Sequence, residues 1–408
     1  MVQVKIPWAA WTDIKEHTLT FPDSWNVQEY PIQNAEDISD KKVRQAIATP
    51  IGTKSISEIA AGKKNAAIVV DDMTRLTPAY RIVPFVIKEL ESAGIHQKDI
   101  VIIIALGAHR PMRRSDMIKK LGESIVNTMN IQNHHPYENL VDLGVTESGT
   151  PIHANKTYYE ADVKIAVSGV IPHPLAGYGG GAKIILPGVC GIETLEANHR
   201  AGLEGGSSGY GYVTKARLDI ESTAEKVGLD YSINVILTMR GGIAGIFAGH
   251  FIDAHRKAME LGKKVYATKT PPKGIDIGIF NLYPEDTELN QANKSFNYIL
   301  SSKTFLTRKA TVLATAACTE GRGYHALMAE TGAKLYTNWG NHILWEIIFR
   351  KRRFAFFSPN VNEADIHHIF PETTIFSRNW DVLIDKLREI HGDAANVAVF
   401  PCSISVPE

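Results

Sequence analysis

The fold class is decided by residues 66–106, which read AAIVVDDMTRLTPAYRIVPFVIKELESAGIHQKDIVIIIAL. Ala66–Val70 is a short, wholly apolar run followed by two aspartates, which is typical of a buried strand that enters a polar loop. Apolar residues recur at helical spacing over Tyr80–Gly94, whose glycine is placed to end a helix. Asp99–Leu106 is a second apolar run. Strand, helix and strand in this order predict a βαβ unit with parallel strands.

The same alternation extends along the chain. Proline residues 271 and 272 interrupt it within Thr268–Gly274, and it then restarts, so we expect a domain boundary there. We predict two α/β domains, residues 1–270 and 271–408, with mainly parallel sheets and an active-site cleft between them. The other predicted strands are Val163–Ile171, two strands joined at Gly241-Gly242 over Ile233–Gly249, Ile275–Phe280, Ala310–Ala316 and Val397–Phe400; the other predicted helices are Asp253–Tyr266, Thr287–Leu300 and Trp380–Ile390.

Composition excludes several classes of protein. The 408 residues contain 44 Lys+Arg and 44 Asp+Glu, and this zero formal charge argues against a nucleic-acid binder. Hydrophobic residues make up 44% of the chain, which is ordinary for a globular protein with a buried core. The three cysteines are far apart in the sequence and favour a reducing compartment. No apolar run reaches membrane-spanning length and the amino terminus lacks a signal-peptide pattern, so we expect a cytoplasmic protein.

Reactive side chains follow three of the predicted strands. Asp71, Asp72 and Arg75 follow the first, His109 follows the second and His173 follows the third. In open α/β sheets ligands bind beyond the carboxyl ends of the strands, so these side chains are candidates for one site. Two imidazoles over one cleft suit acid/base chemistry near neutral pH. The alternatives are a loop salt bridge between Asp72 and Arg75 and histidines that merely cap strand ends.

A glycine-rich stretch, GYGGGAKIILPGVCG at residues 177–191, places Lys183 just after three consecutive glycines. Consecutive glycines let backbone amides approach a phosphate, although the spacing is not that of a Walker loop. The lysine is alternatively a covalent attachment point for a cofactor, or a solvated residue in a tight turn.

Two further signals are weaker when taken alone. His199, in a predicted helix, is a possible metal ligand, but the chain has no HExxH motif, so any other ligands would have to come from a cofactor. Gln291 and Lys294 have a spacing that puts both on one helix face, where an amide and an ammonium suit a substrate carboxylate.

The segments DDMTRLTP, GAHRPM, SGVIPHP, GGGAKIILPG, EANH and NQANK resemble, in order and spacing, the nickel-dependent lactate racemase family. The resemblance runs from about residue 66 to 300. The block that contains His173, Lys183 and His199 is its most specific part.

The resemblance implies a nickel-pincer nucleotide, a nicotinate-derived cofactor bound covalently to Lys183, with His199 as the protein ligand of nickel. It implies that His109 and His173 are the catalytic histidines, which deprotonate the substrate hydroxyl from opposite faces while the cofactor takes the Cα hydride. It implies cofactor-biosynthesis enzymes as partners and a small 2-hydroxy acid as substrate. The remaining positions that it assigns are Asp72, Thr74, Gly180 and Gly181 for the cofactor and Arg75, Asn290, Gln291 and Lys294 for the substrate.

Three departures from the family pattern concern the substrate. Asn290 replaces a tyrosine, Pro174-Leu175 replaces an aromatic residue after His173, and Ala182 stands where a basic residue is usual. We therefore expect a racemase or epimerase acting on a 2-hydroxy acid larger or more polar than lactate. The alternatives are lactate racemase itself, a non-catalytic protein that binds the nickel cofactor, a nucleotide-dependent dehydrogenase, which would want a GxGxxG motif after the first strand, and an enzyme that binds phosphate at the glycine-rich turn.

Overall fold

The structure is a computed structural model that describes residues 1–204, 212–292, 304–327, 349 and 352–408. The chain forms two compact units. We call Ala35–Val265 the central unit, and Met1–Asn34 together with Tyr266–Glu408 the split unit. No helix among the described residues is long and apolar enough to cross a membrane.

The central unit is built on a six-stranded sheet in the order β13-β12-β9-β4-β5-β6. Every neighbouring pair is parallel except β12 and β13, which form an antiparallel hairpin. The predicted βαβ unit and its parallel strands are confirmed, because β4 pairs with β5 along its whole length. The strands are β4 (Ala66–Asp71), β5 (Ile100–Ala105), β6 (Asn130–Asn133), β9 (Val163–Gly169), β12 (Tyr231–Leu237) and β13 (Ile243–Gly249).

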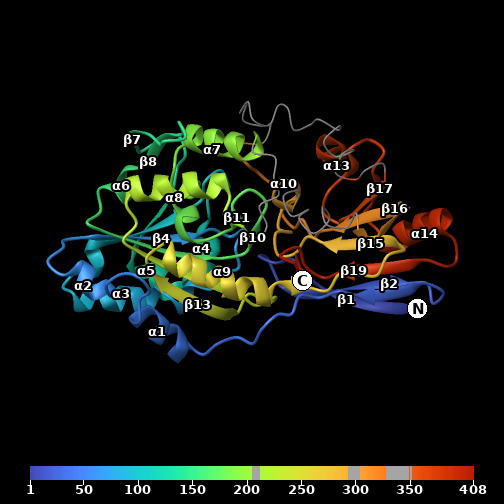
Figure 1. Cartoon of the computed structure of the whole chain (residues 1–408), viewed down its shortest axis with the longest axis horizontal. Helices are drawn as coiled ribbons and strands as arrows, with labels where there is room; N and C mark the ends of the chain where they lie inside the picture. The colour runs from blue at the N-terminus through green and yellow to red at the C-terminus, as the bar shows by residue number, and fades with distance from the viewer. Residues whose placement is uncertain (205–211, 293–303, 328–348, 350–351) are drawn as a thin grey trace. The chain divides into compact units, whose positions relative to one another are not determined.

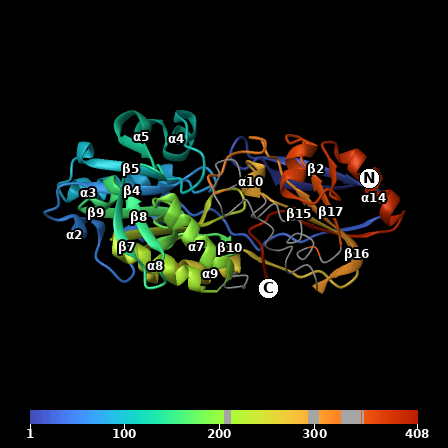
Figure 2. The ribbon, with the colours of Figure 1, turned by 90° about the horizontal axis from the view of Figure 1, so that it is seen from above.

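Helices and short hairpins surround this sheet. Figure 2 shows α4 and α5 beyond β5, on the opposite side of the central unit from α8 and α9. The helices are α1 (Asp40–Ala48), α2 (Ile56–Ala60), α3 (Val83–Ser92), α4 (Arg114–Leu121), α5 (Glu123–Thr128), α6 (Lys156–Tyr159), α7 (Ile192–Glu204), α8 (Lys215–Val227) and α9 (Asp253–Val265), with short 3-10 turns at Ala79–Arg81, Gln97–Asp99 and Gly181–Ile184. The hairpins pair β7 (Leu140–Val145) with β8 (Pro151–Asn155), and β10 (Pro172–His173) with β11 (Gly177–Tyr178).

The split unit contains a second six-stranded sheet, in the order β18-β17-β16-β15-β19-β3, in which every neighbouring pair is parallel. Its elements are β1 (Val2–Trp8), β2 (Lys15–Phe21), β3 (Asn26–Glu29), β14 (Ala267–Thr268), β15 (Ile275–Asn281), α10 (Leu289–Ala292), β16 (Leu306–Thr315), β17 (Arg353–Phe357), α13 (Glu363–Ile369), β18 (Ile375–Ser377), α14 (Trp380–His391), β19 (Asn396–Phe400) and β20 (Val406–Pro407).

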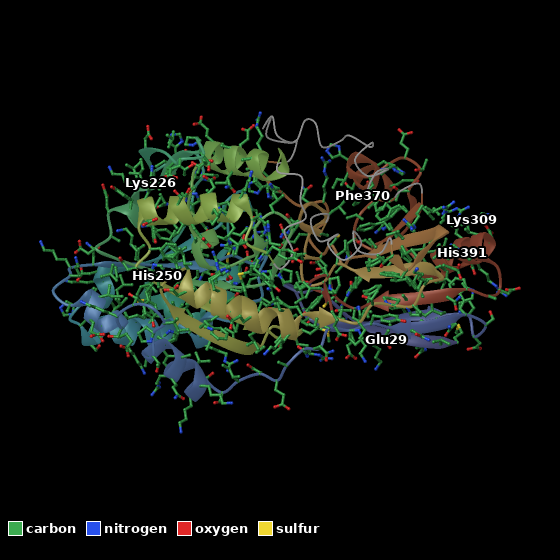
Figure 3. The ribbon with its side chains drawn as sticks, in the orientation of Figure 1. Glu29, Lys226, His250, Lys309, Phe370 and His391 are labelled. Atoms are coloured by element: carbon green, nitrogen blue, oxygen red, sulfur yellow. The ribbon has the colours of Figure 1, made fainter. Side chains whose placement is uncertain are left out.

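The two faces of this second sheet carry separate hydrophobic cores. On β15, Ile277 and Ile279 belong to one core, whereas Phe280 belongs to the other, as the alternation of side chains along a strand requires. Phe370, labelled in Figure 3, packs against the rings of Phe354 and Phe356 in the second of these cores.

The amino-terminal segment lies in a different unit from the one that the sequence predicts. We expected residues 1–270 to form one domain, but Met1–Asn34 groups with Tyr266–Glu408. The physical reason is that β3 adds a parallel strand to β19, and that the β1–β2 hairpin contributes residues such as Leu19 to the same core as Ile277. Figure 1 shows the blue β1 and β2 beside the red β19. The break between the two units falls at Val265, close to the predicted boundary at residue 270.

Candidate active site

Residues 71–77, which begin at the last residue of β4 and continue into the following loop, are the first part of the site, and we call them the aspartate loop. Asp71 holds it in place: its Oδ1 accepts a hydrogen bond from Lys120 Nζ at 2.9 Å, and its Oδ2 accepts one from Thr77 Oγ1 at 2.6 Å. Lys120 is fully buried and also donates to the carbonyl of Arg75 at 2.7 Å. Side-chain charges therefore fix the course of this loop.

Asp72, the next residue, forms a pair with His109, which follows β5. Asp72 Oδ2 lies 2.6 Å from His109 Nδ1, and Asp72 Oδ1 accepts hydrogen bonds from the backbone and hydroxyl of Thr74 at 3.0 and 2.6 Å. Burial alone would raise the pKa of Asp72, but the charge and hydrogen bond of His109, with Thr74 and Arg75, hold that pKa well below its usual range. Asp72 is therefore an ionised carboxylate, which can only accept a hydrogen bond. Nδ1 of His109 thus carries a proton and donates the hydrogen bond to Asp72.

His173 has different surroundings, in the β10–β11 hairpin. Its Nδ1 accepts hydrogen bonds from the backbone N–H groups of Leu175 and Ala176, both at 3.2 Å. Its pKa lies well below the ordinary value, first because of burial and then because of nearby positive charge. The groups that contribute this charge, in order of effect, are Lys183, Arg75, His199 and Arg217. The predicted residues Arg75, Lys183 and His199 thus act electrostatically on one histidine.

Residues 176–184, which we call the glycine-rich loop, are held mainly through their backbone. The fully buried Arg217 of α8 donates to the carbonyls of Ala176 at 3.3 Å, of Gly180 at 3.1 Å and of Tyr178. Gly180 and Gly181 have φ angles of 72° and 55°, which side chains rarely allow.

Glycine is also required at residue 181 by its neighbours. A Cβ there would lie 3.0 Å from the ring of His255, whose Nε2 donates to the carbonyl of Gly179 at 2.8 Å. The N–H of Gly181 donates to Asn234 Oδ1 at 2.8 Å. These glycines therefore serve the packing of the loop.

Lys183 and His199 complete the part of the site in the central unit. Lys183 lies in the turn Gly181–Ile184 and is partly buried. His199, predicted to be helical, lies in α7, and its Nδ1 is 2.7 Å from the carbonyl oxygen of Leu195. A carbonyl can only accept, so Nδ1 donates and the lone pair of His199 is on Nε2, the atom that binds a metal in this tautomer.

The buried carboxylate of Asp219 positions α7, the helix that carries His199. The neighbouring Asn198 donates to Asp219 Oδ2 at 2.8 Å, and the hydroxyls of Thr146 and Thr150 donate to the same carboxylate at 2.6 and 2.8 Å. Within the described ranges, no group of three or more His, Cys, Asp or Glu residues could hold a metal ion.

The predicted substrate residues beyond the linker belong to the split unit. Asn290 and Gln291 lie in α10 and are buried. Asn290 Nδ2 donates to the carbonyl of Gly323 at 3.2 Å, and Gln291 Nε2 donates to Glu285 Oε1 at 3.0 Å. Lys294 and most of the predicted helix Thr287–Leu300 lie outside the described residues.

Sequence reasoning missed Lys120 and Arg217, the two cations that support the loops. Arg217 stands on the buried face of α8 with Ile220 and Ala224, so a charged residue at an apolar helical position was the available signal. Lys120 lies in a helix whose sequence RSDMIKKL gives no such pattern, and its partner is 49 residues away.

The strand ends of the central unit carry a carboxylate–histidine pair, a second histidine and a glycine-rich loop with a lysine. This arrangement is typical of the class of enzymes that work at the carboxyl edge of a parallel sheet. Comparisons with known proteins point to one family. Residues 13–211 match the family described as the lactate racemase N-terminal domain.

Two relatives agree with this match. The chain is 29% identical over 286 residues to lactate racemase of Thermoanaerobacterium thermosaccharolyticum, an alignment that covers 69% of this chain and 66%, just under two thirds, of that protein. It is 27% identical over 394 residues to lactate racemase of Lactiplantibacillus plantarum, which covers 89% of each chain.

The fold agrees as well. The lactate racemase apoprotein from T. thermosaccharolyticum superposes with a TM-score of 0.79 at 23% identity, over 100% of both chains. The chain is thus similar to the lactate racemase family over residues 13–211, and both relatives are named as racemases, which are isomerases. The predicted resemblance to this family and the α/β fold are thereby confirmed.

Proposed function

We propose that this chain is a racemase or epimerase that inverts the C2 centre of a 2-hydroxy acid, and that its substrate is larger or more polar than lactate. The observation that carries the proposal is the grouping of His173 with the charges of Arg75, Lys183 and His199, in the same unit as the Asp72–His109 pair. This reaction requires the protein to supply a proton acceptor and a cation that binds the substrate carboxylate.

The proposal includes a nickel-pincer nucleotide, and the residues present fit such a group. The lone pair of His199 is on Nε2, as a metal ligand requires, and a cofactor that brings its own donor atoms needs only one protein ligand. In the described part of the chain, the hydroxyls of Tyr178 and Ser168 are buried without a hydrogen-bond partner, and a bound polar ligand could satisfy them. In the proposal, Lys183 forms the covalent link and Asp72, Thr74, Gly180 and Gly181 contact the cofactor.

The chemistry divides between cofactor and chain. The cofactor, when bound, supplies an electron-accepting ring that takes the hydride from Cα, which none of the twenty side chains can do. Arg75 binds the substrate carboxylate through its guanidinium. His109 takes the hydroxyl proton on Nε2, because its Nδ1 proton is held by Asp72. A 2-keto acid formed in this way would be planar at C2, and a bound cofactor that returned the hydride to its other face would give the inverted centre.

The cofactor link is tested by intact-protein mass spectrometry and nickel analysis on chain produced together with the cofactor-biosynthesis enzymes. We expect an added mass and bound nickel that both disappear in Lys183→Ala. Lys156→Ala, which changes an exposed lysine, is the matched control and should retain both. A native chain without adduct or nickel, beside a lactate racemase that loads normally, would contradict the cofactor assignment and favour a phosphate-binding enzyme.

The substrate is tested on loaded protein with a panel of 2-hydroxy acids of increasing size. We expect inversion of one of the larger or more polar acids with higher kcat/KM than lactate, and a shift toward lactate in Asn290→Tyr. Efficient turnover of lactate alone would make the chain lactate racemase itself. Loaded protein that inverts no acid would make it a non-catalytic cofactor-binding protein.

A further inference from the structure

Helix α8 supports two separate parts of the candidate site. The guanidinium of Arg217 binds carbonyl groups of the glycine-rich loop, which carries Lys183. The carboxylate of Asp219 binds Asn198 of α7, the residue before His199. Arg217 and Asp219 are two positions apart, so on a helix they point in different directions. One helix thus holds both segments that the proposed cofactor requires.

The carboxylate of Asp219 lies in a buried cluster of hydrogen bonds. Asp219 is 5% exposed, and its three partners are each no more than 4% exposed. Its Oδ2 accepts hydrogen bonds from Asn198 Nδ2 and Thr150 Oγ1, both at 2.8 Å, and its Oδ1 accepts one from Thr146 Oγ1 at 2.6 Å. The turn between β7 and β8 fixes the two threonines, since the N–H of Thr146 donates to the carbonyl of Thr150 at 2.9 Å. A buried carboxylate requires such donors, so the cluster holds Asn198 in one place.

The hydrogen bond to Asp219 fixes the rotation of α7 about its own axis. The helices α7 and α8 lie side by side (Figure 1). Adjacent residues of a helix point about 100° apart, so Asn198, held against α8, sets the direction in which His199 projects. The first turn of α7 has a support of its own, because Thr194 Oγ1 accepts a hydrogen bond from the N–H of His153 at 3.0 Å. The contact of Asn198 with α8 therefore orients the next turn, which carries His199.

The ring of His199 follows any rotation of α7. Its Nδ1 donates to the carbonyl of Leu195 in the same helix at 2.7 Å, so the ring is tied to α7 itself. An atom about 6 Å from a helix axis moves by about 1 Å when the helix rotates by about 10°. A metal–ligand distance tolerates only about 0.2 Å. A small rotation of α7 is therefore enough to weaken a bond between nickel and Nε2 of His199.

We propose that Asp219 is a positioning residue for the nickel site, which acts through Asn198 to hold Nε2 of His199 where the metal requires it. This inference rests on the proposed function and deepens it, because it names the contact on which the retention of nickel depends. Arg217 has the corresponding role for the loop that carries Lys183. One helix, α8, then sets the separation between the attachment point of the cofactor and its metal ligand.

Replacement of Asn198 tests this role in protein produced together with the cofactor-biosynthesis enzymes. The release of nickel into excess EDTA is followed, and the intact mass reports the covalent adduct. We expect Asn198→Ala to retain the added mass but to release nickel about 10–100-fold faster than the native chain, as is usual when the support of a metal ligand is lost. Glu225→Gln, which changes an exposed carboxylate on α8, is the matched control and should release nickel at the native rate.

A pair of substitutions exchanges the two partners. Asn198→Asp sets two buried carboxylates against each other, so we expect it to release nickel at least as fast as Asn198→Ala, although the added negative charge alone would favour a cation. Adding Asp219→Asn moves the amide to α8 and the carboxylate to α7, which again places a donor opposite an acceptor. The double variant should recover most of the lost retention of nickel.

Nickel release at the native rate in Asn198→Ala, whatever its loss of stability in urea, would overturn the proposal, because the contact would then serve the fold alone. Loss of the adduct mass in this variant would overturn it too, as would an exchanged pair that regains no nickel while its circular dichroism matches that of the native chain. A native chain that carries neither adduct nor nickel would refute both this inference and the proposed function. A nickel-loaded chain that inverts no hydroxy acid would refute the proposed function only, since its nickel release still decides the role of Asp219.

Discussion

The aspartate loop and the glycine-rich loop are stabilised in opposite ways. The aspartate loop is held by charged side chains that begin within its own sequence, since Asp71 binds Thr77 of the same loop as well as Lys120. The glycine-rich loop is held by its carbonyl groups, which Arg217 and His255 bind from helices further along the chain. A loop of the first kind carries part of its support in its own sequence, whereas a loop of the second kind depends on residues outside it.

The largest expected effect tests the charged support. Lys120→Met removes the buried cation and leaves the carboxylate of Asp71 buried without it, so we expect the free energy of unfolding to fall by about 3–5 kcal/mol. Urea denaturation of the purified chain measures this change.

The double variant Asp71→Asn/Lys120→Met is the matched control for this prediction. It removes both charges together, so it should be more stable than Lys120→Met alone, because no uncompensated charge remains buried. Equal loss in the single and double variants would mean that the pair contributes through packing, and the contrast between the two loops would no longer rest on charge.

For the aspartate loop, the sequence predicted the strand that leads into it and the aspartates and the arginine that it carries. This was possible because an apolar run and its polar continuation are local features. The tautomer of His173 was out of reach, since it depends on a turn in which the N–H groups of Leu175 and Ala176 converge on one ring nitrogen.

The assignment of Met1–Asn34 failed for a similar reason. Its strands resemble any others in the sequence, and only the pairing of β3 with β19, across most of the chain, determines which unit they join. Long-range pairing leaves no trace in local periodicity.

The stability of the segment after the glycine-rich loop should depend on pH, because the buried His134 binds its backbone. His134 donates from Nε2 to the carbonyl of Cys190 at 2.9 Å and accepts at Nδ1 from Asn155 Nδ2 at 3.2 Å, so its neutral form is fully bonded. Burial lowers its pKa from 6.5 to about 4. The hydrogen bond to Cys190 opposes this shift, and the charge of His135 adds a still smaller lowering.

Because the pKa is lower in the folded chain, the unfolded chain binds the extra proton first as the pH falls. The stabilisation by neutral His134 is therefore complete above about pH 6.5 and is lost as the pH falls toward about 4, by about 3 kcal/mol in total. Unfolding curves of native chain and His134→Gln across this range measure the difference. The neighbouring exposed residue supplies the control, as His135→Gln should retain most of the native pH dependence and remove only the small contribution of its own charge to the pKa of His134.

The backbone-directed support gives a smaller change. Arg217→Lys keeps a cation at this position but not the guanidinium fork, so the carbonyls of Ala176, Tyr178 and Gly180 cannot all be bound. We expect a loss of about 1–3 kcal/mol. Hydrogen exchange should quicken at the amides of the glycine-rich loop and remain unchanged at β4, and faster exchange throughout the central unit would contradict a local role for Arg217.

The smallest effect comes from a charge pair that supports neither loop. Arg200 follows His199 on α7, and its Nη2 lies 2.7 Å from Glu196 Oε1, but the side chain of Arg200 is 56% exposed. Water solvates such a pair about as well as its partner does, so Arg200→Ala should change the free energy of unfolding by no more than about 0.5 kcal/mol and leave nickel loading intact. Arg200→Ala deletes a cation one position from His199. Loss of nickel in this variant would show that the charge around α7, and not the lone pair on Nε2 of His199, governs the affinity of the site for nickel. If Arg200→Ala retains nickel and His199→Ala loses it, nickel binding is assigned to the imidazole of His199, since the two substitutions remove neighbouring side chains from the same helix.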